Sequence, residues 1–368
     1  MTSPGPFLLR RVERRLDPPQ RNAHSTWSER TSLELALGAA QGSLGWGEAA
    51  PLPGYSQDGV HEAERTLAGL PTATLAALAE VDDARTLLDA AAALIPGHQP
   101  AARFALETAL LDRAAQRAGR PLWFTLAALA RPSAYAADAL VAPADAQPVE
   151  LCALLPSGDR SAALALARRH LAAGVTCFKL KVGPDHLTSD QNATLAGLRA
   201  ELGAGVKLRA DANGSLSAAG LRTSLEQLAA HELDFLEEPL AGAEPERLAD
   251  SPCALALDES LQRMPPAALA RWLAQPALRV LVLKPTALGG LGACIELARA
   301  ARAHGREAVV SHALEGPIGW AACAHLALAL GGTRAAGLWP LAHQAAARPR
   351  IEGGRLVPTR EPGLGASA

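Results

Sequence analysis

The sequence predicts an α/β protein with two parts, a closed barrel of eight parallel strands and a smaller α+β domain before it. Three observations support this prediction. The chain has 368 residues, 49% of them hydrophobic, which suffices for two domains or for one barrel with an appendage. Short apolar runs alternate with helical segments from about residue 134 onward. Most of these runs end in a charged or hydroxyl residue, as is typical of barrel strands that open on an active site.

The first part of the chain predicts a small α+β domain. Its strand-like segments are FLLRRVERRL, SLELALGAAQ and GWGEAAPLPGYSQDG, and helical patterns follow from about residue 60 to 128. Between the first two segments, the polar stretch DPPQRNAHSTWSERT predicts a mobile loop. The last residues include PRIEGGRLVP and are long enough to return and pack on this domain. We therefore expect an N-terminal domain of residues 1–130, completed by 341–368, and a barrel over 131–340.

The second part contains eight apolar runs of barrel-strand length. They are AYAADALVA, CFKLKVG, VKLRADAN, LDFLEEP, ALALDES, VLVLKPT, EAVVSHAL and GLWP. The polar residues at the ends of six of them are Lys181, Asp211, Glu237, Asp258, Lys284 and Ser311. Successive gaps are 30, 26, 21, 26 and 27 residues, about one strand-helix unit each. Because all strand ends of a parallel barrel open at one face, we expect these side chains to converge on one cavity.

Lysine is scarce in this chain, and its positions indicate catalysis. Only four of the 35 basic residues are lysines, and Lys179, Lys181 and Lys284 lie in strand-end motifs. Arginine is effectively always protonated, whereas a crowded or desolvated lysine can lose its proton and act as a base. Strand alternation places Lys179 and Lys181 on the same face. Only Lys207, beside a Gly-rich turn, looks incidental.

Three carboxylates from consecutive strand ends, Asp211, Glu237 and Asp258, predict a metal site. Clustered carboxylates repel one another unless a cation neutralises them, and all-oxygen ligation suits Mg²⁺, with Mn²⁺ as a substitute. A metal flanked by lysines suits removal of a proton α to a carboxylate, since the metal stabilises the enediolate and a lysine takes the proton. The like charges of Lys179 and the metal should lower the pKa of Lys181.

Each motif alone also has an ordinary structural explanation. FKLKVG fits a solvated strand face, DANG a turn, EEP a loop and DES a helix N-cap. KPTALGG fits a strand end followed by an anion-binding turn. Independent structural causes would not space the motifs by one unit each, so the ordered set favours a catalytic site.

Composition excludes several other classes of function. The net charge of −2, without basic blocks, argues against nucleic acid and anionic membranes as partners. Five scattered cysteines without a CxxC pair indicate reduced thiols. The start of the chain lacks an apolar segment of signal-peptide length, and the apolar stretches are broken by charges before membrane-spanning length. We expect a cytoplasmic enzyme, and a homo-oligomer remains open.

The ordered motifs resemble the enolase superfamily, over about residues 44 to 330. The resemblance implies a modified (β/α)8 barrel of the TIM type, (β/α)7β, with an α+β N-terminal capping domain. It places the KxK motif on Lys179 and Lys181 and the opposing lysine on Lys284. It assigns the metal to Asp211, Glu237 and Asp258, with Glu237 rather than its neighbour Glu238 as the ligand.

Within the superfamily, the chain is most similar to the o-succinylbenzoate synthases. GWGEAAPLPGYSQD, FLEEPL, LDESL and SHALEGPIG carry this resemblance. It implies a small carboxylate substrate, 2-succinyl-6-hydroxy-2,4-cyclohexadiene-1-carboxylate, which loses water in menaquinone biosynthesis. Lys181 would abstract the α-proton and then assist departure of hydroxide on the same face. Lys284 would stabilise the enediolate from the opposite face.

Substrate contacts are also predicted. They are Arg209, Asn213, Gly289, Gly290 and Ser311. Arg209 lies on the same strand face as Asp211, where it would contact the substrate or instead form an ion pair inside the barrel. Ser311 and the Gly289–Gly290 turn would donate hydrogen bonds to the succinyl carboxylate. Trp27 and the loop around it would close over the substrate, and Gly54, Tyr55 and Ser56 would line the pocket.

Two other functions stay open at this point. An N-succinylamino acid racemase on the same scaffold would use Lys181 and Lys284 from opposite faces. A dipeptide epimerase is disfavoured because GLWP stands where an aspartate pair is expected, and muconate cycloisomerases or sugar-acid dehydratases fit less well. The sugar-acid enzymes use a histidine base, whereas His312 directly follows Ser311 and is predicted to face outward. A non-catalytic binding protein would have lost a lysine or a carboxylate, and none is missing.

Overall fold

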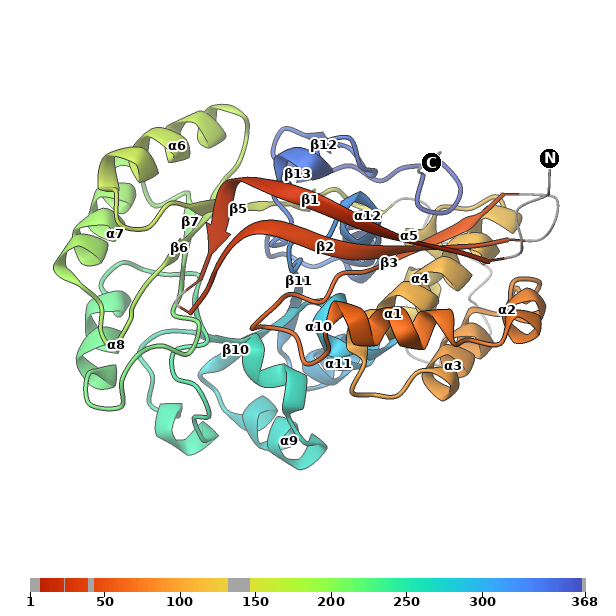
Figure 1. Ribbon diagram of the computed structural model, residues 1–368. Coiled ribbons are helices and arrows are strands. Elements are labelled where there is room, and N and C mark those ends of the chain that lie inside the picture. Colours follow the sequence, from red (N-terminus) through yellow and green to blue (C-terminus); the bar gives the residue numbers. More distant parts are fainter. Residues whose placement is uncertain (1–6, 23, 39–42, 132–145, 366–368) are drawn as a thin grey trace.

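The structure is a computed structural model that describes residues 7–22, 24–38, 43–131 and 146–365 (Figure 1). The N-terminal part begins with an antiparallel sheet of β1 (Phe7–Arg21), β2 (Thr26–Leu37) and β3 (Gly45–Ala49). The long β1–β2 hairpin extends across the molecule towards β6 and β7 (Figure 1).

The prediction of a mobile loop between the first two strands is wrong. Its polar residues lie almost entirely in β1, which ends at Arg21, and in β2, which begins at Thr26. The Asn22 side chain accepts hydrogen bonds from the backbone N–H groups of His24 and Ser25. A two-stranded ribbon exposed on one face can carry polar side chains without a core, so polarity alone did not reveal the strands.

Five helices follow the sheet: α1 (Val60–Ala68), α2 (Thr72–Leu78), α3 (Ala84–Leu94), α4 (Pro100–Arg117) and α5 (Leu122–Ala130). The central helix α4 is buried along most of its length and packs directly on β3. This close approach requires glycine in the strand, because a Cβ atom at Gly47 would collide with the backbone carbonyl oxygen of Ala105.

Seven parallel strands form the barrel, in the order β11–β10–β9–β8–β7–β6–β5. They are β5 (Cys152–Leu155), β6 (Cys177–Lys181), β7 (Lys207–Asp211), β8 (Phe235–Glu237), β9 (Leu255–Leu257), β10 (Leu278–Leu283) and β11 (Glu307–Val310). Parallel bridges from Leu151 to Ala336 and from Ser311 to Gly337 close the circle. The segment that contains Ala336 and the predicted run GLWP thus takes the eighth strand position, and the predicted (β/α)7β barrel with an α+β N-terminal cap is confirmed.

The first barrel strand differs from the prediction. The run AYAADALVA lies outside the described residues, and β5 at Cys152–Leu155 opens the barrel instead. The four residues CALL carry no period that distinguishes a short buried strand from a helix, which is why the sequence did not identify them.

Helices and short 3-10 turns connect the strands. They are α6 (Arg160–Ala172), α7 (Ser189–Leu202), α8 (Leu221–Ala229), η2 (Pro245–Leu248), η3 (Glu259–Arg263), α9 (Pro266–Ala274), α10 (Pro285–Leu288), α11 (Leu291–Ala303), α12 (Pro317–Leu330) and η4 (Ala342–Gln344). One hydrophobic cluster runs through both parts and includes Leu35, Phe104, Phe178 and Trp320. Within the described residues, every helix is too short or too polar to cross a membrane.

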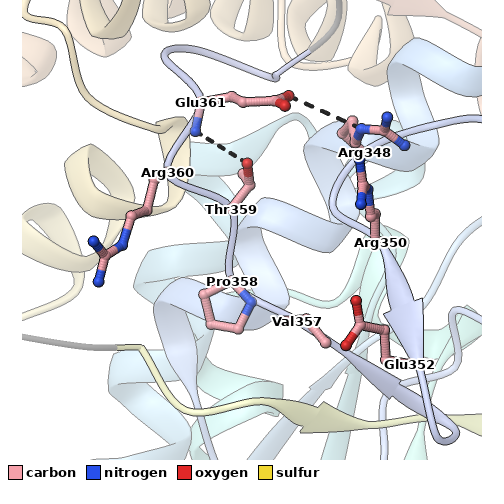
Figure 2. Close-up of a pocket in the computed structure, with 8 residues that line it drawn as sticks. All are labelled: Arg348, Arg350, Glu352, Val357, Pro358, Thr359, Arg360 and Glu361. Carbon is pink, nitrogen blue, oxygen red and sulfur yellow. Dashed lines mark hydrogen bonds and ion pairs between the residues drawn. The ribbon is translucent and has the colours of Figure 1, made fainter.

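The C-terminal segment contacts both parts. Its hairpin of β12 (Ile351–Glu352) and β13 (Arg355–Leu356) pairs with β4 (Val149–Glu150) at the base of the barrel. Further along, Leu364 donates its backbone N–H to Asp112 of α4. A cavity of about 520 Å³ lies along this segment and is lined by mixed charges, among them Arg348 and Glu361 (Figure 2). The domain limits 1–130, 131–340 and 341–368 stay a prediction.

Candidate active site

The predicted lysines and carboxylates come together at the carboxyl ends of the barrel strands. Parallel pairing sets Lys181, Asp211 and Glu237 side by side on three neighbouring strands. Lys179 Nζ lies 2.9 Å from Asp211 Oδ2 and 3.0 Å from Glu237 Oε2. On the other side of the cluster, Lys284 forms an ion pair with Asp258. Three buried carboxylates and two ammonium groups therefore share one end of the barrel.

Lys181 differs from the other two lysines in its pKa. Burial lowers the pKa of Lys181, and although the charge of Asp211 raises it, the charges of Lys179 and Lys284 lower it further. The pKa of Lys181 is lowered, as predicted, but burial contributes more to this shift than the charge of Lys179 does. Burial also acts against the ammonium form of Lys179, yet Asp211 and Glu237 raise its pKa above the ordinary value. Lys181 is thus the lysine suited to accept a proton, and Lys179 stays charged.

The carboxylates also diverge in their pKa values. Burial raises the pKa of Glu237 to about 7, and the neighbouring charge of Asp211 adds to the effect. Burial acts in the same direction on Asp211, but Lys179, Lys181 and Lys284 outweigh it and hold the pKa of Asp211 at about 2. Buried negative charges of this kind favour a bound cation.

The donor set fits a hard divalent ion, although the ligands are not gathered around one point. Within the described ranges, no three carboxylate, histidine or cysteine side chains are arranged to hold a metal ion. Instead, the ammonium group of Lys179 lies within hydrogen-bonding distance of both Asp211 and Glu237, so positive charge already occupies the space between them. All three predicted ligands carry oxygen donors and are 2% exposed, which is the chemistry that Mg²⁺ prefers.

A loop of the N-terminal part reaches into the site. The hydroxyl of Tyr55 donates to Asp258 Oδ1 over 2.9 Å, and Lys284 Nζ lies 4.6 Å from the centre of the Tyr55 ring. The indole N–H of Trp27 donates to the carbonyl oxygen of Pro53 over 2.9 Å, just before this loop turns. Tyr55 thus contacts both a predicted metal ligand and a predicted catalytic lysine.

Two site residues were not predicted. Glu259 accepts a hydrogen bond from the Asn213 side chain over 3.0 Å, and burial raises the pKa of Glu259 to about 7. His24, at the tip of the β1–β2 hairpin, lies 3.0 Å from the carbonyl oxygen of Asn213. Glu259 could have been predicted from the DES motif, which contains it. His24 could not, because its contact with Asn213 joins distant parts of the sequence. Asn213 therefore joins the hairpin to the carboxylate cluster, and its side-chain NH₂ group donates to Glu259.

Arg209, Ser311 and the Gly289–Gly290 turn, which are predicted to contact the substrate, form hydrogen bonds within the protein. Arg209 is 2% exposed and donates to Asp234 and to the carbonyl oxygen of Ala335. This is the ion-pair alternative that the sequence left open. The Ser311 hydroxyl donates to the carbonyl oxygen of Gly337, across the closure of the barrel.

The Gly289–Gly290 turn likewise uses its own donors. The backbone N–H groups of Gly289 and Gly290 both donate to the carbonyl oxygen of Pro285. Gly290 also packs against the Glu107 carboxylate of α4, where a side chain would collide. These N–H groups therefore have partners within the protein, and their contact with a succinyl carboxylate stays a prediction.

His312 is predicted to face outward from its strand, and this orientation stays a prediction. Its side chain is only 10% exposed, and its Nδ1 accepts a hydrogen bond from the backbone N–H of Leu314 over 3.3 Å. Burial lowers the pKa of His312 to about 3, and the charge of Lys284 lowers it further. His312 is thus a neutral, packed imidazole.

Comparison with known proteins places the chain among related enzymes. Residues 162–368 match a family described as enolase C-terminal domain-like. An o-succinylbenzoate synthase from Thermosynechococcus vestitus is 31% identical over 321 residues, which cover 85% of this chain and 86% of that protein. A hydrophobic dipeptide epimerase from Roseobacter litoralis is 30% identical over 66% of this chain and 65% of its own length.

A solved structure adds the fold-level comparison. The dipeptide epimerase from Methylococcus capsulatus, complexed with Mg and the dipeptide L-Arg-D-Lys, superposes with a TM-score of 0.81. Its sequence is 28% identical, and the match covers 98% of both chains. The similarity therefore extends over the N-terminal part as well as the barrel.

Proposed function

The chain belongs to the enolase superfamily, and we propose that it dehydrates 2-succinyl-6-hydroxy-2,4-cyclohexadiene-1-carboxylate to o-succinylbenzoate. The observation that carries the proposal is the pairing of Lys181, with its lowered pKa, and Lys284 around one buried carboxylate cluster. The similarity to an o-succinylbenzoate synthase over most of both chains supports this choice of substrate. The reaction would belong to menaquinone biosynthesis in the cytoplasm.

The lysines divide the chemistry between them. Lys181 Nζ accepts the proton α to the substrate carboxylate, and the electron pair left behind forms an enediolate. The ammonium group of Lys284, on the other side of the cluster, stabilises this negative charge. Protonated Lys181 then returns its proton to the departing hydroxide on the same face, which releases water and makes the ring aromatic. Lys179 remains protonated and orients Asp211 and Glu237.

The carboxylates Asp211, Glu237 and Asp258 would hold Mg²⁺, or Mn²⁺ in its place. When bound, the ion supplies positive charge for the substrate carboxylate as negative charge develops there. Tyr55 would help to orient Asp258, since it donates to that carboxylate. Glu259 and Asn213 hold each other beside the cluster.

A second candidate function is racemisation of an N-succinylamino acid. It is favoured by the same two lysines, because proton removal from one face and delivery to the other needs a lysine on each side. The similarity to a hydrophobic dipeptide epimerase supports a reaction of this kind on the same scaffold. Both reactions share the first step, abstraction of a proton α to a carboxylate.

Steady-state kinetics distinguish the two candidates. The purified protein would be assayed on the cyclohexadiene carboxylate with Mg²⁺, with and without EDTA, beside racemisation of an N-succinylamino acid. Fast metal-dependent dehydration with slow racemisation supports the synthase. Fast racemisation with negligible dehydration would overturn the proposed substrate while leaving the lysines in their roles.

A further inference from the structure

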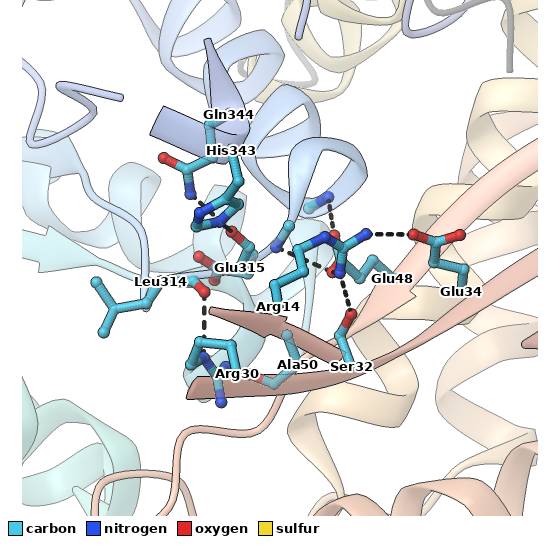
Figure 3. Close-up of polar contacts among 12 residues, drawn as sticks. Arg14, Arg30, Ser32, Glu34, Glu48, Ala50, Leu314, Glu315, His343 and Gln344 are labelled. Atoms are coloured by element: carbon cyan, nitrogen blue, oxygen red, sulfur yellow. Dashed lines mark hydrogen bonds and ion pairs between the residues drawn. The ribbon is translucent and has the colours of Figure 1, made fainter. Parts of the chain in front are cut away.

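A buried arginine lies where the N-terminal sheet meets the barrel. Arg30 of β2 is 3% exposed, and its guanidinium hydrogen bonds go to backbone carbonyl oxygens of two different segments (Figure 3). It donates to Pro51 over 2.9 Å and to Ala50 over 2.5 Å, directly after β3. It also donates to Leu314 over 3.1 Å and to Ala313 over 3.4 Å, in the loop after β11.

Only arginine can make this set of contacts. Its planar guanidinium carries five N–H donors in a fixed fork, so one side chain satisfies two pairs of carbonyl groups that approach from different directions. A lysine ammonium has three donors around one point and would leave carbonyl oxygens without partners. Burial lowers the pKa of Arg30, and the charges of Glu315 and Glu48 oppose that effect. The guanidinium therefore remains charged in a buried position.

The carbonyl groups that Arg30 holds lead directly to the candidate active site. Leu52 follows Pro51, and its carbonyl oxygen accepts the backbone N–H groups of Tyr55 and Ser56 over 3.0 and 2.8 Å. This tight loop points the Tyr55 hydroxyl at Asp258 and the Tyr55 ring at Lys284. The position of Tyr55 thus depends on where the loop leaves β3.

The other pair of carbonyl groups connects Arg30 to the barrel itself. Ala313 and Leu314 follow Ser311, whose backbone N–H pairs with Leu283 at the strand end immediately before Lys284. Arg30 therefore links the loop that carries Tyr55 to the same barrel rim that carries Lys284.

We propose that Arg30 is a positioning residue that fixes the Leu52–Ser56 loop to the barrel and thereby places Tyr55 against Asp258 and Lys284. The inference rests on the proposed function, in which Asp258 and Lys284 act on the substrate. Arg30 itself is buried and does not touch the substrate.

The chain offers a matched control in Arg113 of α4. Arg113 is 5% exposed and donates to the carbonyl oxygens of Ala79 and Ser43 and to Glu80, all within the N-terminal part. Arg113→Lys should therefore remove the same kind of buried contact without reaching Tyr55. R30K and R113K should lower the melting temperature by similar amounts. A difference in kcat/KM between the two variants then does not come from a difference in stability.

The kinetic test compares R30K, R113K, Y55F and the double variant R30K/Y55F in the full chain with Mg²⁺. R30K should lower kcat/KM about tenfold or more, because a small misplacement of groups around the reacting atoms is costly, and R113K should change it less than about twofold. If Arg30 acts through Tyr55, R30K should add little on the Y55F background. Equal kinetic losses in R30K and R113K, or full additivity of R30K and Y55F, would overturn the proposal.

A second measurement does not depend on turnover. Hydrogen exchange at the backbone N–H groups of Tyr55 and Ser56 should be faster in R30K than in wild type and unchanged in R113K. Unchanged exchange in R30K would overturn the proposal. If the wild-type protein turns over neither candidate substrate, the proposed function fails, whereas faster exchange in R30K alone still supports the positioning role. If R30K does not fold, Arg30→Gln, which keeps a planar donor group, is measured in the same two ways.

Discussion

Two of the buried clusters of charged residues in the described part of the molecule are satisfied in different ways. At the strand ends, Lys179 and Lys284 face carboxylates, so side-chain charges meet other side-chain charges. Where the N-terminal sheet meets the barrel, the groups are held mostly by the backbone. Arg30 donates to four carbonyl oxygens, and Glu48 accepts backbone N–H groups of Gly316 and Gly319.

The difference teaches what each cluster can do. Side-chain charges at the barrel mouth can be redistributed when a substrate or a cation arrives, because their partners are themselves titratable. Backbone partners do not titrate, so the interface cluster keeps one geometry. A shifted pKa does not separate the two, since burial raises the pKa of both Glu237 and Glu315 to about 7. The distinction lies in the partners of the charged groups.

The sharpest way to break the comparison is to remove a lysine from the strand-end cluster. Lys181→Ala and Lys284→Ala should each lower kcat by about a thousandfold or more, because each removes a group that acts on the reacting atoms. Both variants should keep the wild-type circular dichroism spectrum. Lys207→Ala is the control, because the Lys207 side chain is 41% exposed and lies outside the cluster. Near-wild-type turnover in both site variants would contradict the proposed mechanism.

The next largest effect compares two buried glutamates with the same raised pKa. Glu237→Gln should weaken Mg²⁺ binding by about a hundredfold or more, at least the loss seen when an outer partner of a metal ligand is removed. Glu315→Gln should leave the affinity unchanged. Isothermal titration calorimetry with Mg²⁺ measures both variants. Equal affinities in E237Q and wild type would show that Glu237 is not a ligand, whatever its pKa.

A smaller effect concerns the pH dependence of stability in the interface cluster. Glu315 is fully buried, and burial raises its pKa from 4.5 to about 7, although Arg30 opposes the rise. The folded state thus holds this proton more tightly than the unfolded state, so the contribution of Glu315 to stability is lost as pH rises towards about 7. Relative to Glu315→Gln, the wild type should lose about 2 kcal/mol of unfolding free energy between about pH 5.5 and about pH 8.

Urea denaturation of both proteins at the two pH values provides the measurement. The glutamine side chain introduced by Glu315→Gln cannot be ionised, so the variant serves as the reference for the remaining groups that titrate. A constant difference between the two proteins across this range would mean that Glu315 stays protonated or is charged at both pH values.

The strand-end residues were predictable because the signal was local. Lys179, Asp211, Glu237, Asp258 and Lys284 each lie in or directly after an apolar run, and parallel strand pairing alone brings such ends together. The structure brings all five into one cluster, while their catalytic and metal-binding roles remain proposals.

The contacts of the N-terminal part were not predictable in the same way. Tyr55 and Asp258 are 203 residues apart in the sequence, and Arg30 and Leu314 are 284 residues apart. Such contacts depend on how the sheet docks on the barrel, for which no local pattern exists. The internal hydrogen bonds of Arg209 and Gly290 were not predictable for another reason, because a sequence does not reveal which donors are already used within the protein.

The smallest predicted effect tests whether Glu48 of the interface cluster is purely structural. Its carboxylate accepts the backbone N–H groups of Gly316 over 2.9 Å and of Gly319 over 2.8 Å, at the beginning of α12. Glu48→Gln keeps one acceptor oxygen but directs an NH₂ group at a backbone donor, and it removes a negative charge from a helix N-terminus. We expect a loss of about 1 kcal/mol of unfolding free energy from these combined changes.

The Glu48 carboxylate binds the beginning of α12 and does not contact the loop of Tyr55. The kcat/KM of E48Q should therefore stay within about twofold of wild type when the variant is assayed well below its melting temperature. Thermal denaturation and steady-state kinetics on the same preparation check both halves of the expectation. A kinetic loss as large as that of R30K would mean that any break between the sheet and the barrel disturbs the site. The backbone-held cluster would then act as one unit, and Arg30 would have no special route to Tyr55.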